Sequence, residues 1–204
     1  MRLLPSGTTA LLAELDDLEQ VQGLYDALTA EPPTGVVDVV PAARTVLVVV
    51  DPAVTTLDAL ARTLRGTALR TGRRRSGELV EVPVVYDGDD LTDAATLLGW
   101  DAAELVRRHT AALWSVAFCG FAPGFGYLVS PDWPDEVPRR SSPRTRVPPG
   151  SVALAGTFSG VYPRESPGGW QLVGRTPLRV FDLARDPAAL LRPGVQVRFV
   201  PEDG

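Results

Sequence analysis

Glycine and proline divide the second half of the chain into short segments, and this constrains the fold more than any other feature of the sequence. Short apolar runs recur there, at 113–118, 151–154, 170–173, 178–183 and 195–200. No periodic segment between them is long enough for the helix that joins two parallel strands. Short strands separated by glycine- and proline-bearing turns are typical of a closed or nearly closed β-barrel.

The first eighty-odd residues follow a different pattern, in which strand-length apolar runs alternate with segments of helical period. Asp16 and Asp17 stand where an N-cap and a first helical turn favour carboxylates. The elements expected in chain order are a strand at 9–14, a helix from residue 18, strands at 36–40 and 45–50, a helix capped by Thr55 or Thr56, and a strand at 79–86. This β-α-β-β-α-β order predicts a ferredoxin-like split unit.

A polar turn at residues 87–90 separates the two patterns. It predicts a boundary between a domain at 1–88 and a domain at 89–204, and hence an α+β chain. The second domain is expected to begin with two short helices, at 91–98 and 102–110. Asp101 and Glu104 have the spacing of a capping box at the start of the second of these helices.

Composition argues against several classes of function. The net charge of −5 argues against nucleic acid, because phosphate binding needs a basic surface. No segment approaches the roughly 20 apolar residues of a membrane span, and no signal-peptide pattern is visible. Cys119 is the only cysteine, which suits a reducing cytoplasm, and its apolar neighbours predict a buried, inert thiol. All 20 basic residues are arginine, so no lysine is present for a Schiff base or a phosphate-binding loop.

The stretch FCGFAPGFGYL, residues 118–128, sets Phe121, Phe125 and Tyr127 among glycines and a proline. Glycine permits close backbone approach and positive φ, and proline fixes its own φ. The three aromatic side chains are therefore expected on a shaped loop, as an apolar wall that excludes water from a site. A hydrophobic turn that only fills the core is the alternative.

Arginines gather between residues 139 and 146, among prolines that stiffen the segment. The planar guanidinium group matches a carboxylate or a phosphate. We expect Arg144 and Arg146, which lead into a strand, to bind an anion, and Arg139 and Arg140 to be solvated. A solvated basic loop is the alternative for all four, and it is our interpretation of arginines 73–75.

Four more residues complete the expected site, which we place at the mouth of the barrel. Gly168 and Gly169 expose backbone N–H groups that suit an anion, and Gln171 is placed to orient a substrate amide. His109 is the only histidine, and hence the only candidate for proton transfer near neutral pH. A glutamine facing water and a histidine that only interacts with its helix end are the alternatives. A metal site is not expected, because the chain has one histidine and one cysteine.

Three long motifs carry a resemblance: GFAPGFGYL at 120–128, PRTRVPPGSVALAG at 143–156 and VYPRESPGGWQLVGRTP at 161–177. With them the chain resembles, over essentially its whole length, the KipI-like family. This is the B subunit of bacterial 5-oxoprolinase, also labelled allophanate hydrolase subunit 1. One departure is that Phe158 and Ser159 stand where the family commonly has Gln-Thr.

The resemblance implies a ferredoxin-like N-terminal domain and a cyclophilin-like antiparallel β-barrel. It also implies a non-autonomous subunit that acts with a KipA-like C subunit, and with a LamB/YcsF-like subunit, in the ATP-driven opening of 5-oxoproline to glutamate. The substrate would be a small lactam or amide, and ATP would bind in the assembled complex. Related modules belong to biotin-dependent urea carboxylase, so a urea-derived amide is an alternative substrate. One member inhibits a sporulation histidine kinase, so a regulatory binding protein is the other alternative.

Overall fold

The computed structural model describes residues 1–70, 78–133 and 135–203. Its contacts divide the chain into two units, Met1–Arg74 and Arg75–Gly204. The arginines at 73–75, which we expected in a solvated loop, lie outside the described residues.

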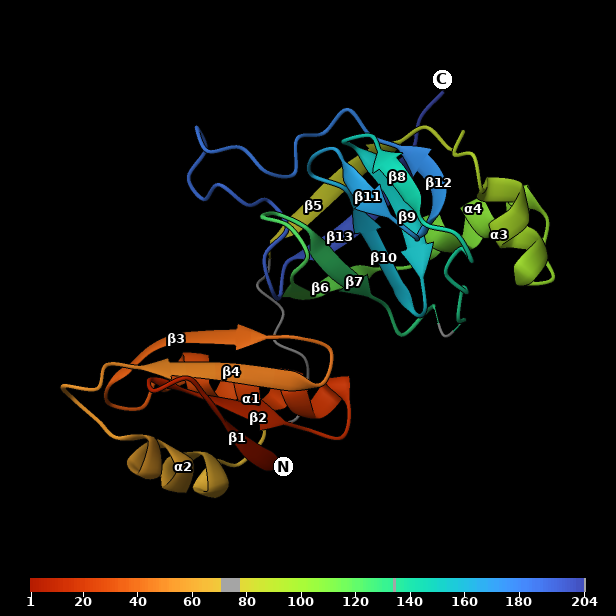
Figure 1. Ribbon diagram of the computed structural model, residues 1–204. Coiled ribbons are helices and arrows are strands. Elements are labelled where there is room, and N and C mark those ends of the chain that lie inside the picture. The colour runs from red at the N-terminus through yellow and green to blue at the C-terminus, as the bar shows by residue number, and fades with distance from the viewer. Residues whose placement is uncertain (71–77, 134, 204) are drawn as a thin grey trace. The chain divides into compact units, whose positions relative to one another are not determined.

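The first unit is a four-stranded antiparallel sheet with two helices (Figure 1). Its elements are β1 (Arg2–Ser6), β2 (Ala10–Glu14), α1 (Leu18–Ala30), β3 (Val36–Pro41), β4 (Thr45–Val50) and α2 (Leu57–Gly66). The strand order is β1-β2-β4-β3. Alternate residues of β2 and β4, such as Leu11 and Val48, form one core with Leu24 of α1 and Leu64 of α2. Both helices therefore bury their apolar sides on the same face of the sheet.

Local side-chain caps set where these helices begin, as the sequence predicted. The side chain of Asp17 accepts a hydrogen bond from the backbone N–H of Gln20 at 2.8 Å, and that of Thr56 accepts one from Ala59 at 3.2 Å. Each cap satisfies one of the backbone donors that a helix leaves unpaired in its first turn.

The second unit contains helices α3 (Leu91–Leu97) and α4 (Ala102–Ala111), close to their predicted bounds. Its strands are β5 (Leu79–Val84), β6 (Trp114–Cys119), β7 (Gly126–Val129), β8 (Arg144–Val147), β9 (Ser151–Ala155), β10 (Phe158–Val161), β11 (Ser166–Gly168), β12 (Gln171–Arg175) and β13 (Gln196–Pro201). Seven of them form a sheet in the order β12-β9-β10-β7-β6-β13-β5, and β8 pairs with β11. The two sheet edges meet where Val85 and Arg175 exchange two backbone hydrogen bonds of 2.9 Å, so the barrel is nearly closed.

The position of β5 differs from the one predicted from the strand order. We expected it to complete the sheet of the first unit, but it pairs with β13 of the barrel. In the first sheet the place beside β2 is taken by β1, a strand that the sequence pattern did not predict, through a tight antiparallel hairpin. The barrel sheet consequently extends across residue 88, and the contacts divide the chain at 74/75 rather than near 88.

The expectation of a wholly antiparallel barrel is also wrong for one pair, because β5 and β13 run parallel. These two strands lie at opposite ends of the unit in sequence, so no short hairpin forces them to be antiparallel. The strand expected at 178–183 is absent: only an isolated bridge from Phe181 to Ala189 forms there. Strands β7, β8, β10 and β11 were not predicted, because glycine, proline and arginine mask their pattern.

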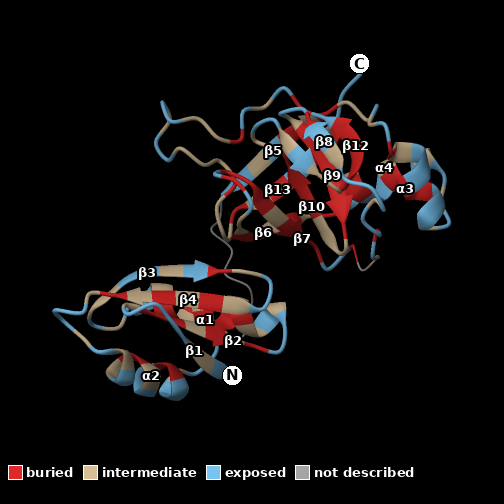
Figure 2. Ribbon diagram, viewed as in Figure 1, coloured by how far each residue is buried: buried red, intermediate tan, exposed pale blue. Residues whose placement is uncertain are grey.

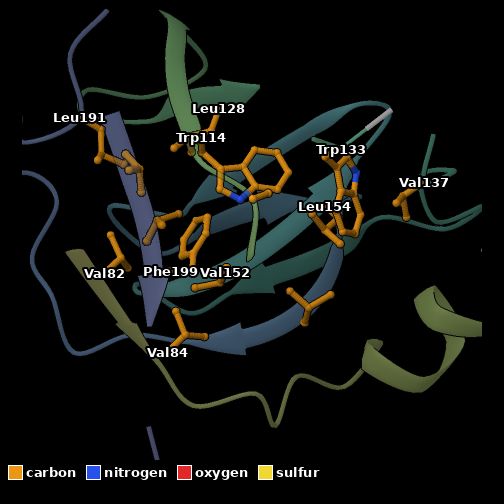
Figure 3. Packing of buried hydrophobic residues seen from close by; sticks show 14 of the residues in the cluster. Val82, Val84, Trp114, Leu128, Trp133, Val137, Val152, Leu154, Leu191 and Phe199 are labelled. Carbon is orange, nitrogen blue, oxygen red and sulfur yellow. The ribbon is translucent and has the colours of Figure 1, made fainter. Parts of the chain in front are cut away.

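The barrel core is built around large aromatic side chains. Trp114, Trp133 and Phe199 are at most 2% exposed, and they pack with aliphatic residues such as Leu154 and Val152 (Figure 3). Buried residues run along barrel strands such as β9 and β10, whereas β8, β11 and parts of α3 and α4 carry exposed residues (Figure 2). Among the residues that the structure describes, no helix is long and apolar enough to cross a membrane.

Candidate functional site

Three of the stretches singled out in the sequence come together on the second unit. The ring of Tyr127 lies 5.4 Å from that of Trp170. The backbone N–H of Arg140 donates to the carbonyl of Gly169 at 2.9 Å, and Gly168 of β11 is paired with Arg144 of β8. The segments around residues 125–127, 138–144 and 166–171 therefore form one contiguous region, with β8 and β11 side by side (Figure 1).

Asp90, which the sequence pattern indicated only as part of a turn, is the polar centre of this region. The residue is 1% exposed, and its carboxylate accepts hydrogen bonds from Arg144 Nη1 at 2.6 Å, Arg144 Nη2 at 2.9 Å and the backbone N–H of Leu172 at 2.8 Å. Arg140 Nη1 donates to it as well. Burial by itself would raise the pKa of Asp90, but the hydrogen bonds from Arg144 and Leu172 and the charges of both arginines lower it overall. Asp90 is therefore an ionised, buried anchor that holds two arginines.

Arg140 and Arg144 bind the carboxylate of Asp90, which is not the role that the sequence predicted for either of them. Arg144 was expected to bind an external anion, but its guanidinium group already faces the carboxylate of Asp90 in a bidentate pair. Arg140 was expected to be solvated, and it shares the same carboxylate. Arg146 is 75% exposed in its side chain and pairs with Glu165 at 2.6 Å, so its charge faces solvent.

Gln171 and Gly168 determine how closely the neighbouring segments pack, whereas Gly169 does not. Gln171 is 5% exposed, and its Nε2 donates to the carbonyl of Pro138 at 2.9 Å, so its amide holds the 138–140 segment. Gly168 leaves space for Tyr162: a Cβ atom at Gly168 would lie 2.3 Å from the tyrosine hydroxyl oxygen. A Cβ atom at Gly169 would meet only ordinary contacts, 3.7 Å from Pro143 Cβ.

The three expected wall residues differ in exposure. Phe125 is 1% exposed and packs its ring 5.3 Å from that of Trp170 and 5.2 Å from that of Tyr162. Tyr127 is half-buried. Phe121 is 58% exposed. Among the described residues it is the only one other than glycine with a positive φ, 67°.

The backbone at Phe121 is a strained turn. The N–H of Ala122 donates to the carbonyl of Gly120 at 2.7 Å, which closes a three-residue γ-turn around Phe121. A positive φ costs a bulky residue about 1–2 kcal/mol, and such strain is concentrated at functional positions. The turn presents the Phe121 ring at the surface, 5.4 Å from the Phe125 ring and 6.1 Å from the Tyr162 ring.

Arg139 and Tyr162 belong to the same region, and the sequence pattern did not assign them to the site. Burial raises the pKa values of Tyr127 and Tyr162, and the positive charge of Arg139 opposes the rise at both hydroxyls. Arg139 is exposed. Unlike Arg140, Arg144 and Arg146, it makes no hydrogen bond or ion pair with another residue of the described ranges.

His109 lies in the barrel core and is fully buried. Its Nδ1 is 2.7 Å from the Tyr86 hydroxyl, its Nε2 is 2.9 Å from Ser159 Oγ, and its ring stacks on Phe199 at 4.3 Å. Burial lowers the pKa of His109 to about 3, so the imidazole is neutral at physiological pH. This placement favours a structural role, which the sequence left open as the alternative to catalysis.

Two further observations limit the chemistry of the region. Cys119 Sγ lies 3.2 Å from the carbonyl of Leu191, and burial raises the pKa of the thiol to about 11, so it is not a reactive thiolate. The described residues contain no group of three or more His, Cys, Asp or Glu side chains that could hold a metal ion. The arrangement is suited to binding an anionic or aromatic group rather than to nucleophilic attack by its own side chains.

The chain belongs to the family described as the carboxyltransferase domain, subdomains C and D, which matches residues 1–191. Within that class it is similar to the B subunit of 5-oxoprolinase, as its motifs indicated. It is 38% identical to the B subunit from Escherichia coli O157:H7 over 206 residues, 96% of this chain and 94% of the relative. It is 44% identical to the B subunit from Bacillus subtilis (strain 168) over 125 residues, 60% of this chain and 52% of that protein.

Solved structures have the same fold. TTHA0988 is 35% identical with a TM-score of 0.78 over 96% of this chain, and the chain spans only 40% of that protein. The uncharacterised protein PH0987 from Pyrococcus horikoshii is 36% identical, with a TM-score of 0.59 over 99% of this chain and 98% of its own. The urea amidolyase of K. lactis is 21% identical, with a TM-score of 0.73 over 98% of this chain and 15% of its own, which shows the shared fold alone.

Proposed function

We propose that this chain is the B subunit of a 5-oxoprolinase complex, which opens the lactam ring of 5-oxoproline with ATP. The observation that carries the proposal is the similarity to the B subunit of the Escherichia coli O157:H7 5-oxoprolinase along nearly the full length of both chains. The region around Asp90 supports it, because an exposed and unpaired arginine, Arg139, lies there with tyrosines and an exposed phenylalanine, which together suit a small planar anion.

The chain contributes positioning and charge to the reaction rather than a complete catalytic site. His109, the predicted proton-transfer residue, is buried with both ring nitrogens hydrogen-bonded. These 204 residues contain no lysine and no GxxxxGK[ST] loop, so this chain does not supply a phosphate-binding loop of that kind. We therefore place ATP in the assembled complex, with a KipA-like C subunit and a LamB/YcsF-like subunit as partners.

The proposal is tested by reconstitution. The purified chain alone should release no glutamate from 5-oxoproline and ATP, and addition of the KipA-like and LamB/YcsF-like proteins from the same genome should give ATP-dependent release. A complex assembled without this chain is the control. If the complete mixture stays inactive toward 5-oxoproline but processes a urea-derived amide, the substrate assignment is wrong. If the chain instead inhibits the autophosphorylation of a histidine kinase, the regulatory alternative holds.

The finer description of the architecture is part of the same proposal. We describe the second unit as cyclophilin-like, and the first as ferredoxin-like with β1 in the place of the fourth strand. We also place the protein in the cytoplasm, where Cys119 would stay reduced.

A further inference from the structure

The 138–140 segment is held at both sides of Arg139 while the side chain of Arg139 is left free. On one side the carbonyl of Pro138 accepts a hydrogen bond from buried Gln171. On the other, the backbone N–H of Arg140 donates to Gly169 and its guanidinium group binds Asp90. An arginine on so fixed a backbone loses little conformational entropy when a ligand binds it.

The surroundings of Arg139 are aromatic and bear hydroxyl groups. Gln171 and Gly169, which hold the segment, flank Trp170, whose ring lies 5.4 Å from Tyr127 and 5.3 Å from Phe125. The ring of Tyr162 lies 5.2 Å from Phe125, and its hydroxyl lies against Gly168. The positive charge of Arg139 acts on the hydroxyls of both Tyr127 and Tyr162, so the unpaired cation and the two phenol groups lie near one another.

Phe121 adds a flat apolar surface to this group. Its strained γ-turn holds an exposed ring 6.1 Å from that of Tyr162 and nearly perpendicular to it, with an interplanar angle of 84°. A relaxed backbone at this position would avoid the positive φ, so the turn is retained at a cost in stability. An exposed ring held in this way can stack on a planar ligand.

We propose that Arg139 binds the carboxylate of the substrate, with Phe121 stacking on its lactam ring and Tyr127 donating a hydrogen bond to it. This inference rests on the proposed function and assigns the substrate-binding role to Arg139 rather than to Arg144 or Arg146. The guanidinium group of Arg144 is committed to Asp90, and that of Arg146 to Glu165. Arg139 is the arginine of this segment whose donors are available to a ligand.

The experiment compares Arg139→Gln with Arg179→Gln in the reconstituted complex. Arg179 is an exposed arginine of the same unit, and it is not one of the residues to which we assign a contact with the ligand. Loss of a charge-assisted contact should raise the KM for 5-oxoproline about 10- to 150-fold, whereas Arg179→Gln should keep the wild-type KM. Phe121→Ala should raise KM as well, and Arg139→Lys should recover part of the loss, because it restores the charge but not the planar fork.

A binding measurement on the full chain separates the sources of the effect. Calorimetry should show that the chain binds 5-oxoproline and that Arg139→Gln weakens this binding. Pyrrolidin-2-one, the same ring without the carboxylate, should bind weakly, and Arg139→Gln should leave its affinity unchanged. Inorganic phosphate that competes more strongly than 5-oxoproline would overturn the carboxylate assignment. If the complex is active and Arg139→Gln keeps the wild-type KM, only the role of Arg139 is wrong. If the wild-type complex is inactive toward 5-oxoproline, both the proposed function and the assignment of 5-oxoproline as the ligand are wrong.

Discussion

Asp90 and Arg144 are joined by two hydrogen bonds, Nη1 to Oδ2 at 2.6 Å and Nη2 to Oδ1 at 2.9 Å, although 54 residues separate them in the chain. The carboxylate of Asp90 also accepts from Leu172 of β12 and from Arg140. This group of contacts ties the turn before α3 to β8, to β12 and to the segment that carries Arg139.

Asp90→Asn should destabilise the protein by about 2–4 kcal/mol, because it leaves two partly buried arginines without their counter-charge. The measurement is the free energy of unfolding in urea at pH 7. Asp89→Asn is the matched control, since the Asp89 side chain is 78% exposed and lies 3.5 Å from Arg144. It should change stability by less than about 0.5 kcal/mol. Equal effects of the two substitutions would contradict the role given to Asp90.

Arg144→Ala and Arg146→Ala should differ in the same way. The side chain of Arg144 is 19% exposed and that of Arg146 is 75% exposed. Loss of Arg144 should lower the melting temperature by several degrees, since about 1 kcal/mol corresponds to roughly 2–4 °C in a protein of this size. Loss of Arg146 should leave it unchanged. If Arg146→Ala causes a large rise in KM in an intact complex, Arg146 binds the substrate, as the sequence analysis predicted.

Gly168→Ala should destabilise the protein by about 1–3 kcal/mol, because the new Cβ atom would overlap the hydroxyl of Tyr162, 2.3 Å away. Gly169→Ala is the control, because its Cβ atom would lie 3.7 Å from Pro143. Thermal unfolding of the two variants measures the difference. If they unfold at the same temperature, Gly168 does not act by making room for Tyr162.

The stability of the protein should fall between pH 7 and pH 5. The pKa of His109 is about 3 in the folded protein because of burial, and about 6.5 in the unfolded chain. The unfolded state therefore binds more protons in this range, so stability is full above about pH 6.5 and decreases as the pH falls toward the folded pKa. The contribution of His109 to this decrease from pH 7 to pH 5 is about 2 kcal/mol.

Urea unfolding at pH 7 and pH 5 measures this dependence, and His109→Gln isolates it, because the chain has no other histidine. The variant should be less stable at pH 7, where it loses the stacking on Phe199, but its stability should change less between the two pH values. An NMR titration gives a second readout: the ring signals of folded His109 should not shift between pH 8 and pH 5.

Below pH 5, the loss of stability with falling pH should depend on Asp90. Its folded pKa is lowered, so its contribution to stability is present above the unfolded pKa of about 3.9 and is lost as the pH falls through the folded value. Asp90→Asn should flatten the stability profile below pH 4. An unchanged acid transition in this variant would show that other carboxylates dominate it.

The sequence by itself determined the features that depend on neighbours in the chain. The starts of α1, α2 and α4 follow from Asp17, Thr56 and Asp101, whose side chains cap N–H groups three residues further on. The glycine-rich stretch at 118–128 and the turn expected at 166–169 were singled out for one site because glycine and proline interrupt the regular pattern there, although residues 166–168 form β11. The family motifs, which span residues 120–177, then indicated the relatives.

Only the tertiary structure decided which distant groups pair with one another. The apolar run of β5 suits either sheet equally well, and it joins the barrel because β1 already occupies the edge beside β2. Glu104 has the capping-box spacing, but its side chain pairs with Arg107 and Arg108 instead.

The arginines also show the difference between what the sequence determines and what the tertiary structure decides. An arginine's charge is paired or free according to whether a carboxylate reaches it, and Asp90 reaches Arg140 and Arg144 but not Arg139. Local propensity carries no information about contacts across such separations, because they form only when strands and loops far apart in the chain are brought together by the burial of the core.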